Sequence, residues 1–155
     1  MAESVDSKDL HRIVVTCVIQ KSDTFLIKKR RSDREPFPGR WEVAGGGVNR
    51  SDYIDLPKGK DGYENVLDIA IRREVKEETN LTIAAIRYIG DSFFIRQKDD
   101  VPVLVLRFAA HYADGEVILD DEATEYAWVT AQDVDQYDLI GSGAEDIKKC
   151  DAELR

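Results

Sequence analysis

The sequence predicts one mixed α/β domain, and three observations support this fold class. Runs of β-branched and apolar residues occur before and after a single stretch with clear helical periodicity. No internal repeat or linker divides the chain. Of its 155 residues, 43% are apolar and 34% are charged, a composition typical of a globular domain with a hydrophobic core. We therefore expect residues 1–155 to form one domain, with a short N-terminal tail over residues 1–10.

The first half of the chain is expected to consist mainly of strands and loops. Residues 11–20 and 24–30 are rich in apolar and β-branched residues and predict two paired strands separated by a short turn. Residues 31–40 contain two prolines and a glycine and predict a loop. The segment WEVAGGGV, residues 41–48, predicts a short strand that runs into a glycine-rich turn.

A helix is predicted over residues 66–79. Apolar residues recur there every four positions and form one stripe along the helix: Leu67, Ile71 and Val75. A second stripe beside it carries three carboxylates at i, i+3 and i+4: Glu74, Glu77 and Glu78. The helix should therefore pack one edge into the core and hold its carboxylates at the border with solvent.

The second half of the chain predicts further strands and a C-terminal helix. Long strands are expected at residues 81–96 and 101–113, and a shorter one at residues 125–129. Thr130 has the character of a helix N-cap, and residues from Ala144 onward are predicted to be helical.

Charge and composition exclude several classes of function. The formal net charge of −9 argues against general binding to nucleic acid or to an anionic membrane. The N-terminal tail lacks the basic flank and apolar segment of a signal peptide, and no apolar run is long enough to span a bilayer, so we expect a cytoplasmic protein. Two cysteines make no disulfide framework; we expect a buried Cys17 and a more exposed Cys150.

Three neighbouring carboxylates on one side of a helix repel one another unless water screens them or a cation holds them. A solvated acidic face is the simpler interpretation, because Arg73 and Lys76 lie beside them. The alternative is a site for Mg²⁺ or Mn²⁺, hard cations that prefer carboxylate, water and phosphate oxygens. In that case Arg73 could hold one carboxylate in a fixed rotamer.

The surrounding sequence resembles the Nudix hydrolase family. The family's box runs Gly, five residues, Glu, seven residues, then Arg-Glu-apolar-any-Glu-Glu-any-Gly-apolar, and its second half is matched here by REVKEETNL, residues 73–81. The preceding WEVAGGGV is similar to the strand that leads into the box. The resemblance covers residues 11–137.

The first half of the box departs from the pattern. Counted from Gly46, Glu64 follows after seventeen residues instead of five, which indicates an insertion of twelve within the loop at about residues 49–63. Eight residues separate Glu64 from Arg73 where the box has seven, and strict spacing would select Asn65. Asn80 replaces the box glycine, a mild change because Asn tolerates the left-handed backbone at a helix end.

The resemblance implies a fold, a cofactor and a set of site residues. The fold would be an α/β/α sandwich around a mixed β-sheet, and the cofactor Mg²⁺, with Mn²⁺ as an alternative. The metal would be held by Glu74, Glu77 and Glu78, together with a backbone carbonyl of Gly45 or Gly46. Dimers are common in such enzymes, and nothing in this sequence establishes one.

The resemblance leaves the general base open between two regions. Glu77 is the candidate within the box, and Glu122 is the preferred candidate in the acidic loop before residues 125–129, followed by Glu125 and Asp121. That loop could equally be a solvated acidic segment. Arg30 lies where similar enzymes contact the nucleotide phosphates, and it could equally be an exposed arginine at the strand end, in the basic run KKRR.

The implied reaction is metal-dependent hydrolysis of a nucleoside diphosphate linked to another group. A nucleoside triphosphate, including an oxidised one, is slightly favoured, and the products would be a nucleoside monophosphate and pyrophosphate. The alternatives are ADP-ribose or a nucleotide sugar as substrate, or a non-catalytic nucleotide sensor or interaction module. All three box glutamates are present, which favours an enzyme.

Overall fold

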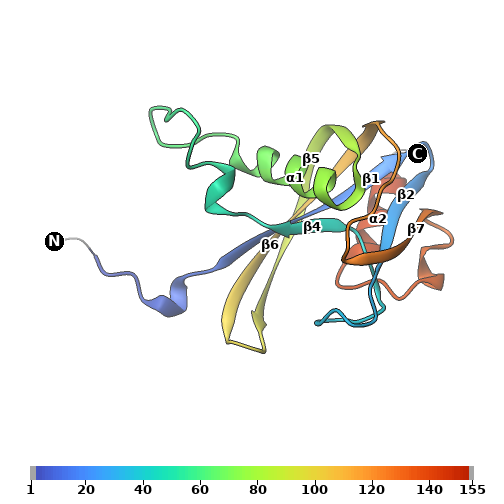
Figure 1. Ribbon diagram of the computed structural model, residues 1–155, viewed down its shortest axis with the longest axis horizontal. Helices are drawn as coiled ribbons and strands as arrows, with labels where there is room; N and C mark the ends of the chain where they lie inside the picture. The colour runs from blue at the N-terminus through green and yellow to red at the C-terminus, as the bar shows by residue number, and fades with distance from the viewer. Residues whose placement is uncertain (1–2, 154–155) are drawn as a thin grey trace.

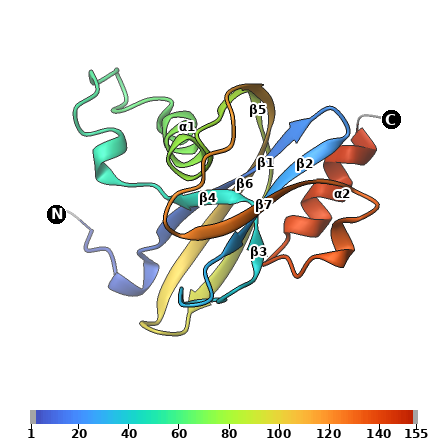
Figure 2. The same cartoon turned by 45° about the vertical axis from the view of Figure 1, so that its right-hand side comes forward.

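The computed structural model describes residues 3–153 and shows an α/β/α sandwich. Figures 1 and 2 show a twisted sheet between two helices, with α1 (Val66–Thr79) on one face and α2 (Gly143–Glu153) on the other. The predicted fold class is thus confirmed, and the bounds of α1 are those that the periodicity predicts. Short 3₁₀ helices occur at Ser7–Asp9, Arg50–Asp52 and Val134–Gln136.

Seven strands form one mixed sheet in the order β3-β2-β1-β6-β5, with β4 paired to β1 and β7 paired to β2. Only the β1–β6 pair is parallel among the described residues, and the other pairs are antiparallel. The strands are β1 (Arg12–Lys21), β2 (Thr24–Arg30), β3 (Trp41–Glu42), β4 (Ala44–Gly47), β5 (Thr82–Arg96), β6 (Val101–Asp114) and β7 (Ala123–Thr130).

Two hydrophobic clusters attach the helices to the two faces of the sheet. Alternate residues of β1, namely Val15, Cys17 and Ile19, belong to the cluster that packs beneath α1, whereas Val18 belongs to the cluster beneath α2. From α1, Ile71 and Val75 are almost fully buried, and Leu67 packs against the same cluster from a partly buried position. This packing fixes which face of α1 looks into the core, and so where its carboxylates emerge.

Two expectations about the C-terminal region are wrong. Thr130 caps a turn, accepting a hydrogen bond from the backbone amide of Asp133. This turn leads only into the short 3₁₀ helix Val134–Gln136 and not into an α-helix. The chain then becomes extended, because Asp138 accepts a backbone hydrogen bond from Trp41 at 3.0 Å. Cys150 is 1% exposed rather than more exposed than Cys17, because α2 turns it into the second cluster.

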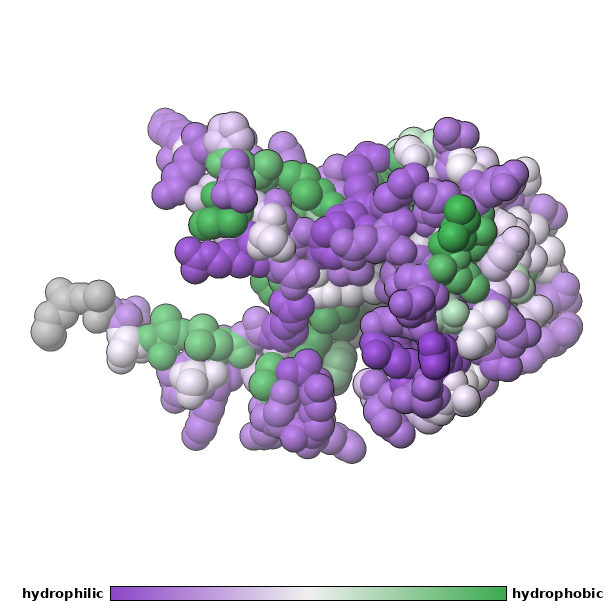
Figure 3. Space-filling model, in the orientation of Figure 1, coloured by the Kyte–Doolittle hydropathy of each residue, from purple (hydrophilic) through white to green (hydrophobic). Residues whose placement is uncertain are grey.

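The surface is mainly hydrophilic on the face drawn in Figure 3, in keeping with the net charge of −9. Residues 49–63 project from the N-terminal side of α1, on the same side of the molecule as the N-terminal segment in Figure 1. No helix among residues 3–153 has the length and apolar character needed to cross a membrane.

Candidate active site

The three glutamates of α1 differ sharply in exposure. Glu74 and Glu78 are buried, with 9% and 7% of their surface exposed, whereas the side chain of Glu77 is 58% exposed. Glu74 and Glu78 lie one turn apart on the same side as Val75, and Glu77 lies on the outer edge of the helix. The predicted position at the border between core and solvent is confirmed. Glu74 and Glu78 lie on the core side of this border, and Glu77 lies on the solvent side.

Arg73 gathers the outer carboxylates around one guanidinium group. Its Nη1 atom donates to Glu74 Oε1 at 2.8 Å and to Glu77 Oε2 at 3.1 Å. Its Nη2 atom donates to the carbonyl oxygen of Gly47 at 2.9 Å and to Asp52 at 3.0 Å. A single cationic nitrogen therefore already sits between Glu74 and Glu77, and the guanidinium is fixed to β4 and to the loop that follows it.

The glycines of β4 allow the strand to approach α1 closely. A Cβ atom at Gly46 would lie 2.4 Å from the carboxylate carbon of Glu74, and one at Gly47 would lie within 1.7 Å of the Arg12 guanidinium. Arg12 uses that space to donate to the carbonyl oxygen of Val48 at 2.7 Å. Only a residue without a side chain at position 46 leaves the Glu74 carboxylate where Arg73 holds it.

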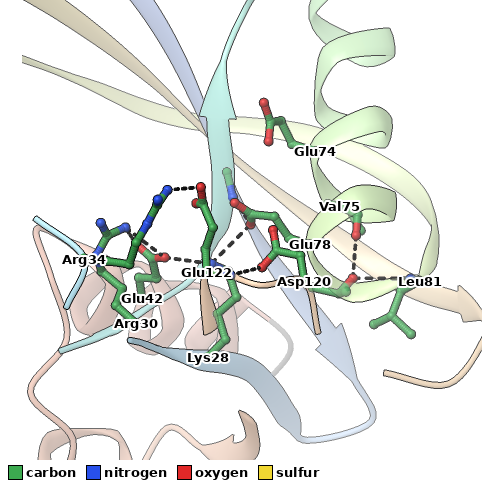
Figure 4. Close-up of polar contacts among 12 residues, drawn as sticks. Lys28, Arg30, Arg34, Glu42, Glu74, Val75, Glu78, Leu81, Asp120 and Glu122 are labelled. Carbon is green, nitrogen blue, oxygen red and sulfur yellow. Dashed lines mark hydrogen bonds and ion pairs between the residues drawn. The ribbon is translucent and has the colours of Figure 1, made fainter. Parts of the chain in front are cut away.

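Glu78 points away from the outer pair into a buried group of charges. Its Oε2 atom accepts a hydrogen bond from the amide of Gly45 at 3.0 Å and lies 3.5 Å from Lys28 Nζ. Lys28 is 1% exposed, and its ammonium also donates to Glu42 Oε1 at 2.6 Å. Figure 4 shows Lys28 reaching from β2 toward Glu42, Glu78 and Asp120.

Burial dominates the electrostatics of this inner group. It raises the pKa of Glu78 to about 8, although Lys28 and the amide of Gly45 both favour the charged form. Burial also raises the pKa of Glu74, and the contact with Arg73 opposes that shift. For Lys28, burial acts to lower the pKa, but the charges of Glu78 and Glu42 outweigh it and the pKa is raised. Glu78 thus keeps a raised pKa despite its cationic neighbour, whereas the acidic neighbours of Lys28 keep the lysine charged.

Asp52 is a site residue that was not among the residues predicted from the sequence. Its side chain is 1% exposed, and its Oδ1 atom accepts from Arg73 Nε at 2.5 Å, which lowers the pKa of the carboxyl. Glu64 instead lies beside Gly59 in the projecting loop. Five residues separate Gly46 from Asp52, which is the spacing that the box gives to its acidic residue.

From the position of Asp52 we infer an insertion that begins a few residues later than the expected residues 49–63. Twenty residues separate Asp52 from Arg73 where the box has seven, so thirteen additional residues follow the acidic position, at Tyr53–Asn65. We call this segment the insertion loop. The signal was present in the sequence as an Asp in place of a Glu, and the search for a glutamate passed over it.

Of the remaining predicted site residues, Arg30 lies close to the buried charges around Lys28, whereas Glu122 has its partner outside this group. Arg30 Nη1 lies 3.4 Å from both oxygens of Glu42, and its buried Nε atom has no hydrogen-bond partner. Glu122 forms an ion pair with Arg34, from the loop between β2 and β3. The structure thus places Arg30 beside the inner group and ties Glu122 to a loop arginine.

The other two acidic candidates, one in β7 and one in the loop before it, point elsewhere. Glu125 pairs with Lys29 at 3.0 Å, and the backbone oxygen of Asp121 accepts from Arg31 at 3.4 Å. Asp120, which the sequence did not single out, is the loop carboxylate whose charge acts on Lys28. Strand alternation along β2 could have revealed the buried position of Lys28, because it places Lys28 and Arg30 on the same face of the strand.

The donor set suits a hard divalent cation, although the side chains are not gathered into a finished metal site. Within residues 3–153, no three His, Cys, Asp or Glu side chains converge on one point. Glu74 and Glu77 nevertheless share one cationic partner, and Gly46 leaves the space beside Glu74 free of side-chain atoms. These oxygens are the ligands that Mg²⁺ and Mn²⁺ prefer.

A cavity of about 310 Å³ lies on the α2 face of the sheet, next to β4. Val43, which precedes β4, and Thr16, which pairs with Gly45, both line it. Phe37 and Phe94 contribute two aromatic side chains, and Arg107 bonds Ser142 at 3.0 Å at its polar end. Larger hollows of about 680 and 430 Å³ occur at the N-terminal segment and beside Asp120–Asp121. The smaller cavity combines apolar walls with a few polar groups, as small-molecule sites do.

Comparison with known proteins identifies the family. The NUDIX domain model matches residues 10–150. Nucleoside triphosphatase NudI of Escherichia coli is 31% identical over 133 residues, covering 83% of this chain and 88% of that protein. Its counterpart from Escherichia fergusonii is 29% identical over 128 residues, with the same coverage.

Solved structures share the fold at lower sequence identity. A MutT protein from Methanosarcina mazei has a TM-score of 0.66 and 22% identity, and covers 93% of this chain and 94% of its own. The NUDIX domain of Shewanella oneidensis NrtR, solved with ADP ribose, has a TM-score of 0.71 and 16% identity, covering 97% and 94%. With the family model, the site geometry and these relatives in agreement, the chain belongs to the Nudix family and is a hydrolase of phosphoanhydride bonds.

Proposed function

We propose that this protein is a magnesium-dependent pyrophosphohydrolase that converts a nucleoside triphosphate to a nucleoside monophosphate and pyrophosphate. The observation that carries the proposal is the arrangement around Arg73, which brings Glu74 and Glu77 together beside the side-chain-free Gly46. A relative of 31% identity is named as a nucleoside triphosphatase, which favours this substrate class.

Glu74, Glu77 and Glu78 would hold Mg²⁺ or Mn²⁺, with a carbonyl oxygen of Gly45 or Gly46. When bound, the metal supplies positive charge to the phosphates and lowers the pKa of the attacking water. Arg73 holds Glu74 and Glu77 beside β4, because it donates to both carboxylates and to the carbonyl oxygen of Gly47. Nudix hydrolases generally use divalent ions, and carboxylate oxygens such as those of these glutamates are the ligands that such ions prefer.

Two of the chain's own residues would act on the phosphates and the water. Arg30 would bind a phosphate oxygen, because its guanidinium lies at the end of β2 and its Nε atom has an unused donor. Glu77 would accept the proton of the attacking water, because it is the one box glutamate with a largely exposed side chain. Glu122 is the alternative base, and it would first have to leave its ion pair with Arg34.

The nucleoside would lie in the cavity on the α2 face. A nucleotide that crosses the glycine strand β4 would place its phosphates by α1 and its base between the aromatic walls at Phe37 and Phe94. ADP-ribose is the second candidate, since a structural neighbour was solved with ADP ribose bound. That neighbour is 16% identical, so it supports the fold more directly than the substrate.

The test is hydrolysis across a substrate panel with Mg²⁺ and again with excess chelator. The panel contains ordinary and oxidised nucleoside triphosphates, ADP-ribose, nucleotide sugars and dinucleoside polyphosphates. We expect turnover of triphosphates to pyrophosphate and monophosphate, and its loss with chelator. Turnover confined to ADP-ribose or nucleotide sugars would show that these compounds, and not nucleoside triphosphates, are the substrates. Equal turnover with and without divalent ions would overturn the metal assignment.

A further inference from the structure

We propose that the protein forms a symmetric dimer in which the last part of β5, residues 91–96, pairs with the same segment of a second copy. We call this segment the pairing edge. The proposal does not depend on the reaction proposed above, and its test needs neither nucleotide nor metal.

β5 lies at one edge of the sheet, and within residues 3–153 it pairs only with β6. The backbone groups on its other side are therefore open to a further strand. Over residues 82–90 the register with β6 shifts three times, so this part of the edge is irregular. Residues 91–96 pair with residues 101–106 of β6 without a shift. The regular segment is thus the part of β5 that presents an even row of donors and acceptors to a partner.

The pairing edge also carries apolar side chains that a monomer leaves uncovered. Phe93, Phe94 and Ile95 are 64%, 50% and 57% exposed. Figures 1 and 2 show that the β5–β6 hairpin extends beyond both helices, so neither helix covers its end. Natural edge strands are usually protected by a charge, a proline or a bulge, and residues 92–95 contain none of these. An edge that is both regular and apolar is suited to pair with another strand.

A second copy of the same edge is the occupant that fits these side chains. Two antiparallel copies related by a two-fold axis keep each side chain on its own face of the joined sheet, so opposed residues differ by an even number of positions. With Phe94 opposite the partner's Phe94, Phe93 lies opposite the partner's Ile95. Every apolar side chain of the segment then has an apolar cross-strand neighbour. A dimer centred on Phe93 would instead place Ile95 opposite the partner's Asp91.

Charge and area are those of a reversible dimer. Asp91 and Arg96 give the pairing edge one charge of each sign, whereas the whole chain carries −9. Association is therefore opposed by long-range repulsion only, and added salt should strengthen it. Phe93 and Phe94 alone leave on the order of 200 Å² uncovered on each copy. With the paired backbone, the buried area approaches the roughly 1,000 Å² at the lower end of specific interfaces, so the dimer should dissociate on dilution.

The first experiment is sedimentation velocity over a range of protein concentrations. We expect the wild type to pass from monomer to dimer as its concentration rises. Ile95→Lys should raise the dissociation constant at least about 10-fold, because the two-fold axis places the substitution twice in the interface. Ile118→Lys is the matched control, since Ile118 is 63% exposed in the loop before β7 and outside the pairing edge. It should leave the dissociation constant unchanged.

The second experiment tests the register by cysteine cross-linking with the thiol oxidant diamide. Phe94→Cys should give a covalent dimer, because directly opposed residues of antiparallel strands lie within disulfide distance. Phe93→Cys should cross-link poorly alone and well when mixed with Ile95→Cys. The wild type is the control, since Cys17 and Cys150 are each 1% exposed.

Three outcomes would overturn the proposal. A wild type that stays monomeric at every concentration would leave this edge to a different protein. Equal weakening by Ile95→Lys and Ile118→Lys would place the dimer contact elsewhere. Efficient cross-linking of Phe93→Cys alone, without cross-linking of Phe94→Cys, would contradict the register. None of these results bears on hydrolysis, so the proposed function stands or falls separately.

Discussion

The outer and inner parts of the carboxylate site use the same residue type in opposite ways. On the outside, Glu74 and Glu77 share the guanidinium of Arg73, which is partly exposed and bonded to a backbone carbonyl. On the inside, Glu78 shares Lys28 with Glu42, and the lysine is almost completely buried. Adjacent glutamates of one helix therefore differ in solvation and in partner. The difference shows that Glu74 and Glu77 lie at the solvent boundary with a partly exposed arginine, whereas Glu78 has a buried lysine as its partner.

The largest expected effect comes from removing the exposed outer carboxylate. Glu77→Gln should lower kcat by about 10²–10⁴-fold, because a proton acceptor and a metal ligand are lost together. The protein should stay folded, since the Glu77 side chain is largely exposed and its ion pair with Arg73 lies at the surface. The measurement is steady-state hydrolysis of the preferred triphosphate together with thermal unfolding. A fully active variant would remove Glu77 from the mechanism.

A methyl group at Gly46 tests whether the outer carboxylates need the open space beside β4. Gly46→Ala places a Cβ atom 2.4 Å from the Glu74 carboxylate, which is the far end of a flexible side chain and has to move. We expect metal affinity or kcat to fall by about 10–100-fold, as when the support of a metal ligand is lost. The unfolding temperature should change little. A large loss of stability with normal metal affinity would contradict this interpretation.

A paired substitution distinguishes the two acidic residues near the box. Asp52→Asn should destabilise the protein by about 1–3 kcal/mol, because Arg73 loses a buried charged acceptor. Glu64→Gln, in the insertion loop, should change stability by less than about 0.5 kcal/mol. Urea unfolding of both variants gives the comparison. Equal effects, or a larger effect at Glu64, would indicate that Glu64 and not Asp52 is the acidic residue of the box.

The smallest effect concerns the pH dependence of stability without divalent ions. Burial raises the pKa of Glu78 to about 8 from its ordinary value of 4.5, so the folded protein keeps a proton that the unfolded chain releases. The stability from this group is fully present below pH 4.5 and is lost as the pH rises through about 8. Glu78→Gln should therefore lose less stability than the wild type between about pH 5 and 9. Unfolding temperatures in chelator measure the difference, and parallel curves would contradict it.

The sequence predicted the parts of this site that depend on local pattern. The apolar period of Leu67, Ile71 and Val75 was enough to place α1 and its carboxylates, because burial of that stripe orients the helix. Asn80 was expected to accept a left-handed backbone, and it does so with φ of 64°. These features need no information from distant segments.

The parts that were missed depend on contacts between distant segments. Whether Glu77 or Glu78 is buried depends on Lys28 and Glu42, which come from other strands. In the run KKRR only Arg30 was considered, either as a phosphate contact or as an exposed strand-end arginine, and strand alternation was not applied to Lys28. The role of Asp52 was hidden because the thirteen residues after it displace the familiar spacing to Arg73.

The anchoring of the insertion loop makes it a suitable place to attach a reporter. Its first end follows Asp52, which is held by Arg73, and its second end is Asn65, directly before the first residue of α1. At its tip, Gly59 and Gly62 exchange backbone hydrogen bonds, with the shorter at 2.7 Å, and close a small turn. Lengthening a loop whose ends are already fixed costs little entropy. A fluorophore or a short peptide grafted between Gly59 and Gly62 would therefore report on the helix that carries the carboxylates without entering their hydrogen-bond network.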